Sequence, residues 1–250
     1  MLTPRFRGFL LAVALVSAAT VCLPASADPG LPFGLSAAQI VDRMQARDRE
    51  RTQELKGYKT LRHYEVEYRG FSNRIDAKMS VEVNFDASSG KNFVIVSQGG
   101  SKFLLEKVLK RAIDSEKEAF QQKKSTALTT ENYRFNLLGQ EILDGRPAYI
   151  MNVEPLVPSK FLYRGKIWVD AADFAMVKME TEPAKSPSFW ISRTQIHYTG
   201  AKTDGFWMPQ VMRSETSVRI GGVAVLTINY GNYRFAAGPP PDTQATLRHE

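Results

Sequence analysis

Apolar and polar residues alternate with a period of two along much of the chain. Tyr64, Val66 and Tyr68 alternate with Glu65 and Glu67, and this pattern predicts a strand with one buried face. The next segment repeats the alternation at Ile75, Ala77, Met79, Val81, Val83 and Phe85. The two segments are predicted to form a hairpin.

The same type of pattern recurs in later segments, which are separated by turn residues. Ser88-Ser89-Gly90 leads into a third strand with Phe93 and Ile95. Asp144-Gly145 and Gly221-Gly222 are strong turn signals. The remaining strands are predicted at 133–138, 148–154, 162–170, 176–182, 189–199, 210–220 and 223–235.

Two segments have helical spacing instead. Ser36 with Gln39 three residues later forms a capping box for a helix that runs to about Leu55, before Gly57. Ser101 can cap a second helix that reaches about Gln122. Its apolar residues keep helical spacing at Leu104, Leu105, Val108, Leu109 and Ala112.

About ten strands and two helices without a long β-α alternation predict a mainly β (α+β) fold with a meandering antiparallel sheet. Such a wide sheet rarely stays open and flat, so we expect strong curvature. The second helix interrupts the strands, and it could cover an edge or opening of the sheet.

The N-terminal 27 residues have the features of a secretory signal. Arg5 and Arg7 precede an apolar run, and Ala25-Ser26-Ala27 forms a cleavage box. We therefore predict a signal peptide over 1–27, cleaved after Ala27, a single domain over 28–237 and a disordered tail over 238–250. An uncleaved anchor and a lipid-modified N-terminus at Cys22 are the two alternatives.

Charge and cysteine content narrow the function classes. Cys22 is the only cysteine, so cleavage leaves a chain without disulfides or thiolate metal sites. Cleavage also lowers the net charge from +7 to about +5, because it removes Arg5 and Arg7 and no acidic residue. The basic residues are spread along the chain, which argues against nucleic acid and favours at most transient contact with anionic membranes.

The chain offers no convincing catalytic or metal site. Its three histidines, His63, His197 and His249, lack the spacing of a zinc site. No Gly-x-Ser-x-Gly elbow or phosphate loop occurs. The carboxylate pairs Glu65/Glu67 and Asp170/Asp173 are interpreted as solvated outward residues. We predict no cofactor and no enzyme, with a hydrolase that uses His63 or His197 as the alternative.

The chain does supply many apolar and aromatic residues on its strands. They include the flexible methionines Met79, Met151, Met179 and Met212 and the tryptophans Trp168, Trp190 and Trp207. These residues could fill an ordinary core or line a lipid cavity. Taking one alternation phase on each strand, we predict a cavity lined by Phe85, Phe93, Ile95, Tyr149, Met151, Val177, Met179, Ile196 and Tyr198.

Several motifs resemble the bacterial outer-membrane lipoprotein-sorting proteins of the LolA/LolB-like superfamily, most closely an uncharacterised branch. The resemblance covers most of the mature chain. It rests on Asn132-Tyr133-Arg134-Phe135-Asn136-Leu137-Leu138-Gly139, Asp144-Gly145-Arg146-Pro147-Ala148-Tyr149, Gly165-Lys166-Ile167-Trp168-Val169-Asp170, Asp173-Phe174-Ala175 and Pro187-Ser188-Phe189-Trp190.

The resemblance implies a periplasmic protein with an unclosed antiparallel β-barrel whose mouth is covered by helices. In that superfamily the concave apolar face accepts the acyl chains of lipoproteins, and a related branch senses envelope stress. The implied function is therefore a periplasmic carrier or chaperone that binds lipid or lipoprotein acyl chains. The alternative is an interaction module that docks on an envelope protein through a sheet edge or through Lys107, Lys110 and Arg111.

Overall fold

A computed structural model describes residues 34–236 except 72, 187–188, 190 and 220. The predicted signal peptide, the predicted tail and His249 lie outside this range. Trp190 does so as well. Every described helix and strand belongs to one compact unit that begins at Leu35.

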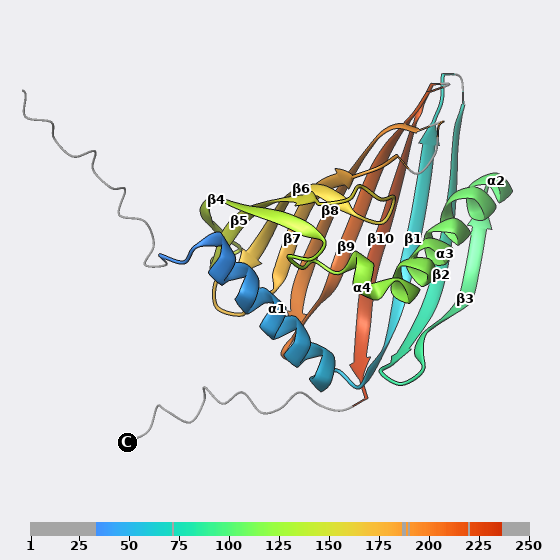
Figure 1. Ribbon diagram of the computed structural model, residues 1–250. Helices are drawn as coiled ribbons and strands as arrows, with labels where there is room; N and C mark the ends of the chain where they lie inside the picture. The colour runs from blue at the N-terminus through green and yellow to red at the C-terminus, as the bar shows by residue number, and fades with distance from the viewer. Residues whose placement is uncertain (1–33, 72, 187–188, 190, 220, 237–250) are drawn as a thin grey trace, which may run out of the picture. The chain divides into compact units, whose positions relative to one another are not determined.

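Ten strands form one antiparallel sheet in the order β3-β2-β1-β10-β9-β8-β7-β6-β5-β4 (Figure 1). The two outermost strands, β3 and β4, do not pair with each other, so the sheet is unclosed. The strands are β1 (Gly57–Arg69), β2 (Arg74–Asp86), β3 (Gly90–Gly100), β4 (Tyr133–Leu143), β5 (Arg146–Pro155), β6 (Tyr163–Asp170), β7 (Met176–Pro183), β8 (Ile191–Thr203), β9 (Phe206–Val218) and β10 (Val223–Phe235).

The predicted antiparallel meander is confirmed, and its tight turns follow from local sequence. Asp144-Gly145 and Asp204-Gly205 connect β4 to β5 and β8 to β9. All four of these residues have positive φ, as two-residue hairpin turns require. β1 and β10 are far apart in the sequence but pair along most of their length, which joins the two ends of the meander into one sheet.

Helix α1 (Ala37–Glu54) starts at the predicted capping box, in which Ser36 and Gln39 satisfy each other's backbone N–H groups. Its buried side chains are Ile40, Val41 and Met44. The charged second half of the helix is mostly exposed, because arginines and acidic residues dominate it.

The second predicted helix is one helical stretch with a change of winding. It comprises α2 (Lys102–Leu104), a π-helical turn η1 (Leu105–Leu109) and α3 (Lys110–Gln121), and a short helix α4 (Lys123–Thr126) follows. Ser101 occupies the N-cap position, but its side chain makes no capping hydrogen bond.

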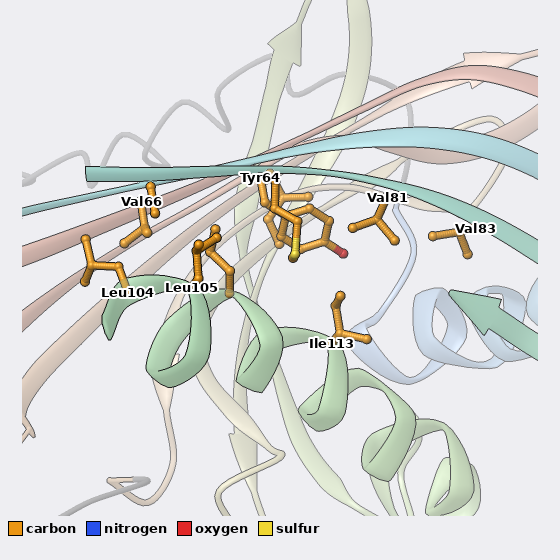
Figure 2. Packing of buried hydrophobic residues seen from close by; sticks show 11 residues of the cluster. Tyr64, Val66, Val81, Val83, Leu104, Leu105 and Ile113 are labelled. Carbon is orange, nitrogen blue, oxygen red and sulfur yellow. The ribbon is translucent and has the colours of Figure 1, made fainter. Parts of the chain in front are cut away.

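The best-defined core lies between this helical stretch and strands β1, β2 and β10. Leu104, Leu105, Leu109 and Ile113 pack onto the sheet. Figure 2 shows Leu104, Leu105 and Ile113 facing Tyr64, Val66, Val81 and Val83 from the strands. Each of these side chains is at least nine-tenths buried, and burying one such side chain stabilises the fold by about 1.5–3 kcal/mol.

Candidate ligand-binding face

We call the sheet surface that faces α1 and α3 the inner face. Cross-strand partners place nine residues in one line across it, from β4 to β2. All nine are apolar or aromatic, and we call this line the central row. It consists of Leu137, Met151, Ile167, Met179, Tyr198, Met212, Ile228, Tyr64 and Met79.

Four members of the central row are the methionines that the sequence singled out as flexible. Met79, Met151, Met179 and Met212 come from four different strands, yet register brings them onto one line. Thioether side chains adapt to ligands of irregular shape and occur often on promiscuous binding surfaces. The row is therefore an apolar surface with adjustable side chains.

Burial along the central row is uneven. Met151 and Ile167 are buried on one side, and Ile228, Tyr64 and Met79 are buried on the other. Met179, Tyr198 and Met212, on the adjacent strands β7, β8 and β9, are only partly buried. We call these three residues the open strip, because solvent reaches apolar side chains there.

The neighbouring row mixes small and large side chains. Next to the open strip it contains Thr181, Ile196 and Ser214, which are cross-strand partners on β7, β8 and β9. It continues to Gly165 on one side and to Leu226, Val66 and Ala77 on the other. A chain lying along the central row would therefore meet the short side chains of Thr181 and Ser214 beside the open strip.

A charged network holds α3 against the inner face. Arg62 on β1 is 2% exposed, and its Nη1 donates to Glu116 Oε2 at 2.7 Å. Lys91 Nζ on β3 donates to the other carboxylate oxygen of Glu116, also at 2.7 Å. The Arg62 guanidinium lies 4.7 Å from the ring centre of Tyr230. One carboxylate on the helix thus joins two strands.

The network shifts the pKa values of its members in consistent directions. Burial lowers the pKa of Arg62, but Glu116 raises it by more, so the guanidinium stays charged. Burial raises the pKa of Glu116, and the nearby charges of Lys91 and Arg62 lower it below its usual value. Burial also raises the pKa of Tyr230 well above its usual value. Arg62 and Glu116 are therefore ionised at neutral pH, and Tyr230 is neutral.

Helix α1 lies over the other part of the inner face. Tyr149 on β5 stacks on Phe174 with ring centres 6.3 Å apart, and the Arg43 guanidinium lies 5.1 Å from the Phe174 ring centre. Further along the helix, Arg51 Nη1 donates to the Trp207 carbonyl. The open strip is flanked by α1 on one side and by α3 on the other.

The structure places eight of the nine predicted cavity residues on the inner face, but they do not form one enclosed group. Met151, Met179 and Tyr198 belong to the central row, and Ile196 lies in the neighbouring row. Phe93 packs against the α3 core, while Ile95 on the edge strand is exposed. Phe85 lies nearer a turn, in an aromatic cluster with Tyr58. Tyr149 also lies nearer a turn, where its ring stacks on Phe174.

The prediction was wrong for the face of Val177. A register shift between β6 and β7 at Trp168 and Val169 pairs Val169 with Met176. The extra residue turns Val177 to the opposite face, where it packs with Ala148 and Trp168.

Two pockets border the sheet among the described residues. One, of about 680 Å³, lies at the start of β1 and is lined by Tyr58, Phe85 and Phe235 together with polar residues such as Lys91 and Asn92. The other, of about 130 Å³, lies on the opposite face beside Trp207, Arg146 and Val177. The larger pocket has the volume of a typical small-ligand site.

The histidines and carboxylates do not assemble into a reaction centre within the described residues. His63 and His197 are exposed on strands, and no group of three metal-ligating side chains is found in the described part. Asp170 is buried, which corrects the prediction that it is solvated. It accepts two hydrogen bonds from Arg146 and two from the backbone of the β6–β7 turn, so its role there is structural.

No family model and no curated protein matches the chain. Several solved structures do, and lipoprotein-sorting proteins are among them. A DUF1329 family protein from Desulfovibrio piger has 14% identity and a TM-score of 0.43, and the match covers 82% of this chain and 95% of that chain. A putative outer membrane lipoprotein-sorting protein domain from Vibrio parahaemolyticus has 14% identity and a TM-score of 0.40 over 82% and 95% of the two chains.

A LolA superfamily protein from Nitrosomonas europaea, NE2245, has 12% identity and a TM-score of 0.34 over 82% of this chain and 96% of that chain. The group that the sequence motifs resemble is therefore found among the structural matches.

Proposed function

We propose that the chain is a periplasmic binding protein that holds the acyl chains of a lipid or lipoprotein against the central row. The observation that supports this most is the open strip, where Met179, Tyr198 and Met212 remain partly exposed between two helices. Apolar side chains in that position gain free energy when a hydrocarbon chain covers them. Binding of this kind needs no catalytic group.

An N-terminal segment with signal features supports the periplasmic part of the proposal. In the part of the chain that the structure describes, no helix has the length and apolar character needed to cross a bilayer.

We infer that the helical stretch from α2 to α3 acts as a cover that can leave the inner face. The Arg62–Glu116–Lys91 network and the buried apolar side chains of the stretch together hold it on the sheet, where it fills the adjacent part of the inner face. Breaking the network would weaken this hold, and release of the cover would extend the apolar surface beyond the open strip. Ligands that prefer the larger surface would then favour the released state.

The first test is binding in solution and in extracts. Protein purified from its native envelope is extracted for mass spectrometry of bound lipid, and the ligand-free protein is titrated with fluorescent fatty acids of increasing length. Affinity should rise about fourfold per added methylene, from ~0.8 kcal/mol each. Absence of lipid together with no response to any probe would reject the proposal.

A pair of neighbouring substitutions locates the site. Met212 and Val211 are adjacent on β9 and point to opposite faces, and both are partly buried. Met212→Gln should weaken probe binding about tenfold, because a polar amide would be buried under the chain. Val211→Gln is the matched control and should bind like the wild type. Equal effects of the two substitutions would place the ligand elsewhere.

The edge strand β3 favours a second candidate function, docking of a protein partner. Val94, Ile95 and Val96 are 47%, 40% and 61% exposed on a strand without an outer neighbour. An extended peptide could add to this edge as an eleventh strand. Val96→Pro removes a backbone donor and should abolish cross-linking to a partner in cells, while acyl-probe binding should be unchanged if the edge is the only contact.

A further inference from the structure

The two ends of the sheet carry opposite charge. In an antiparallel meander, alternate connections lie at opposite ends of the strands. Segments 69–74, 156–162, 184–190 and 219–222 contain no acidic residue, and we call them the basic end. Their charged residues are Arg69, Arg74, Lys160, Lys185 and Arg219.

The opposite connections have the reverse composition. Segments 86–90, 144–145, 170–175 and 204–205 contain no lysine or arginine, and we call them the acidic end. Their charged residues are Asp86, Asp144, Asp170, Asp173 and Asp204. Ion pairs offset part of this difference, because Lys160 pairs with Glu118, and Asp170 and Asp173 pair with Arg146. The connections at the two ends still differ in the charged residues that they contain, which the modest net charge of the chain does not show.

The basic end also exposes large apolar side chains. Phe71 in the β1–β2 turn is 93% exposed, and Phe189 between β7 and β8 is 74% exposed. Val157 in the β5–β6 connection is 74% exposed. Exposed apolar side chains mark an interaction surface when they form a patch, and Phe71 and Phe189 both contact the β9–β10 connection.

Contacts between the connections hold this surface together. Tyr68 OH donates to the Gly221 carbonyl at 2.8 Å, which ties the β1–β2 hairpin to the β9–β10 hairpin. The Phe71 ring lies directly on Gly221, where a Cβ would be only 2.0 Å from the ring. The Arg219 guanidinium lies 5.0 Å from the centre of the Phe189 ring. Phe71 and Phe189 therefore both contact the β9–β10 connection, which also carries Arg219.

We propose that the basic end docks onto an anionic phospholipid bilayer. Phe71 and Phe189 would enter the boundary between head groups and acyl chains, while Lys185 and Arg219 would contact the phosphates. Exposed aromatic rings beside cations on loop ends suit a bilayer surface. Glu67 forms ion pairs with both Arg69 and Arg74 and neutralises part of their charge. Lys185 and Arg219 should therefore contribute more to the attraction to an anionic bilayer.

The inference goes beyond the proposed function, because docking needs no ligand on the inner face. The proposed membrane contact and the proposed ligand site nevertheless lie next to each other. Tyr68, an inner-face residue of the α3 core, lies three residues from Phe71 and contacts Gly221. A bilayer at the basic end would therefore meet the end of the apolar face.

The test measures co-flotation of the full chain with lipid vesicles. Binding to phosphatidylglycerol–phosphatidylcholine vesicles is expected, with much weaker binding to pure phosphatidylcholine. The double variant Phe71→Ser/Phe189→Ser should bind the anionic vesicles at least about tenfold less tightly. Ile142→Ser is the matched control, because Ile142 is 58% exposed on β4 beside the acidic end, and it should bind like the wild type.

Charge reversal provides an independent readout. Arg219→Glu should weaken vesicle binding by about fivefold or more, from the contribution of one basic residue at an anionic surface. Lys59 is exposed at the opposite end of β1, and Lys59→Glu should leave vesicle binding unchanged. Raising the salt concentration should weaken the wild type and have less effect on Arg219→Glu.

Three results would overturn the proposal. They are no vesicle binding by the wild type, an equal loss in the Ile142→Ser control, and binding only to vesicles that carry an envelope protein, which would indicate a protein partner. Acyl-probe binding in solution separates this proposal from the previous one. The double phenylalanine variant should keep that binding, whereas Met212→Gln should bind the probe about tenfold more weakly and still float with vesicles.

Discussion

Two parts of the inner face have the same kind of side chains but different cover. Under the helical stretch from α2 to α3, Tyr64 and Met79 of the central row are almost completely buried against leucines of α2 and η1. In the open strip, Met179 and Met212 continue the same row but remain partly exposed. Cover by a helix, and not strand composition, decides which part of the sheet is buried core and which part keeps its apolar side chains open to solvent.

The largest effect is expected where the helix fills the face. Leu109 is fully buried between η1 and the sheet, so Leu109→Ala should lower the free energy of unfolding by about 2–5 kcal/mol. Phe103 on the same helical stretch is 63% exposed, and Phe103→Ala should change it by less than about 0.5 kcal/mol. Denaturant unfolding measures both. A small effect at Leu109 would mean that η1 is not a firm part of the core.

An intermediate effect is expected at the ionic contact of the cover. Glu116→Gln should lower the free energy of unfolding by about 1–3 kcal/mol, because hydrogen bonds to charged partners are weakened and Arg62 loses its counter-charge. Glu118→Gln is the control, since Glu118 pairs with Lys160 on the surface. Similar losses of unfolding free energy in the two variants would show that Glu116 stabilises the fold no more than a surface carboxylate does.

The same network predicts a pH dependence. The pKa of Glu116 is lowered from 4.5 by Lys91 and Arg62, which outweigh its burial. A lowered carboxyl pKa stabilises the folded state fully above pH 4.5, and this stabilisation is lost as the pH falls through the lower folded pKa. Stability measured between pH 7 and pH 3 should therefore fall less steeply in Glu116→Gln than in the wild type. Equal slopes of stability against pH in the variant and the wild type would contradict the ion pairing of Glu116 with Lys91 and Arg62.

The smallest effect on stability is expected in the open strip. Met212→Gln should lower the free energy of unfolding by less than about 1 kcal/mol, because the side chain is partly solvated in the ligand-free protein. Thermal unfolding with and without a long-chain fatty acid measures this. At the same concentration, the ligand should raise the Tm of the wild type more than that of the variant. A loss as large as that of Leu109→Ala would show that the strip is ordinary core.

Much of this arrangement was predictable from local patterns. Period-two alternation and Gly-containing turns gave the meander, and the Ser36–Gln39 box gave the start of α1. The four methionines could be selected because they fall in apolar positions of strands. Their alignment on one row could not, since it depends on the register between strands, which no single segment determines.

The charged network was missed although the sequence held a signal for it. Arg62 has the same alternation phase as Tyr64 and Val66, so it had to face inward or break the pattern. Its partner Glu116 is 54 residues away on a helix, and nothing local indicates which carboxylate would meet it. Only the tertiary packing of α3 brings the pair together.

Two other errors have local causes that periodicity cannot detect. The additional residue in β7 reversed the face of Val177, because a bulge shifts every later residue of a strictly alternating assignment. Asp170 was interpreted as solvated because aspartate is usually exposed. In the structure Arg146 neutralises it and turn N–H groups satisfy it, which makes burial of the carboxylate tolerable.

The free edges β3 and β4 have a mechanical consequence. A closed barrel can widen only by breaking a ladder of backbone hydrogen bonds, whereas this sheet ends in two strands that do not bond to each other. It can bend more or less tightly while all nine ladders stay intact, and only side-chain contacts with the helices resist the change. The width of the apolar inner face can thus change at low elastic cost, and ligands of different widths would fit the site that we propose there.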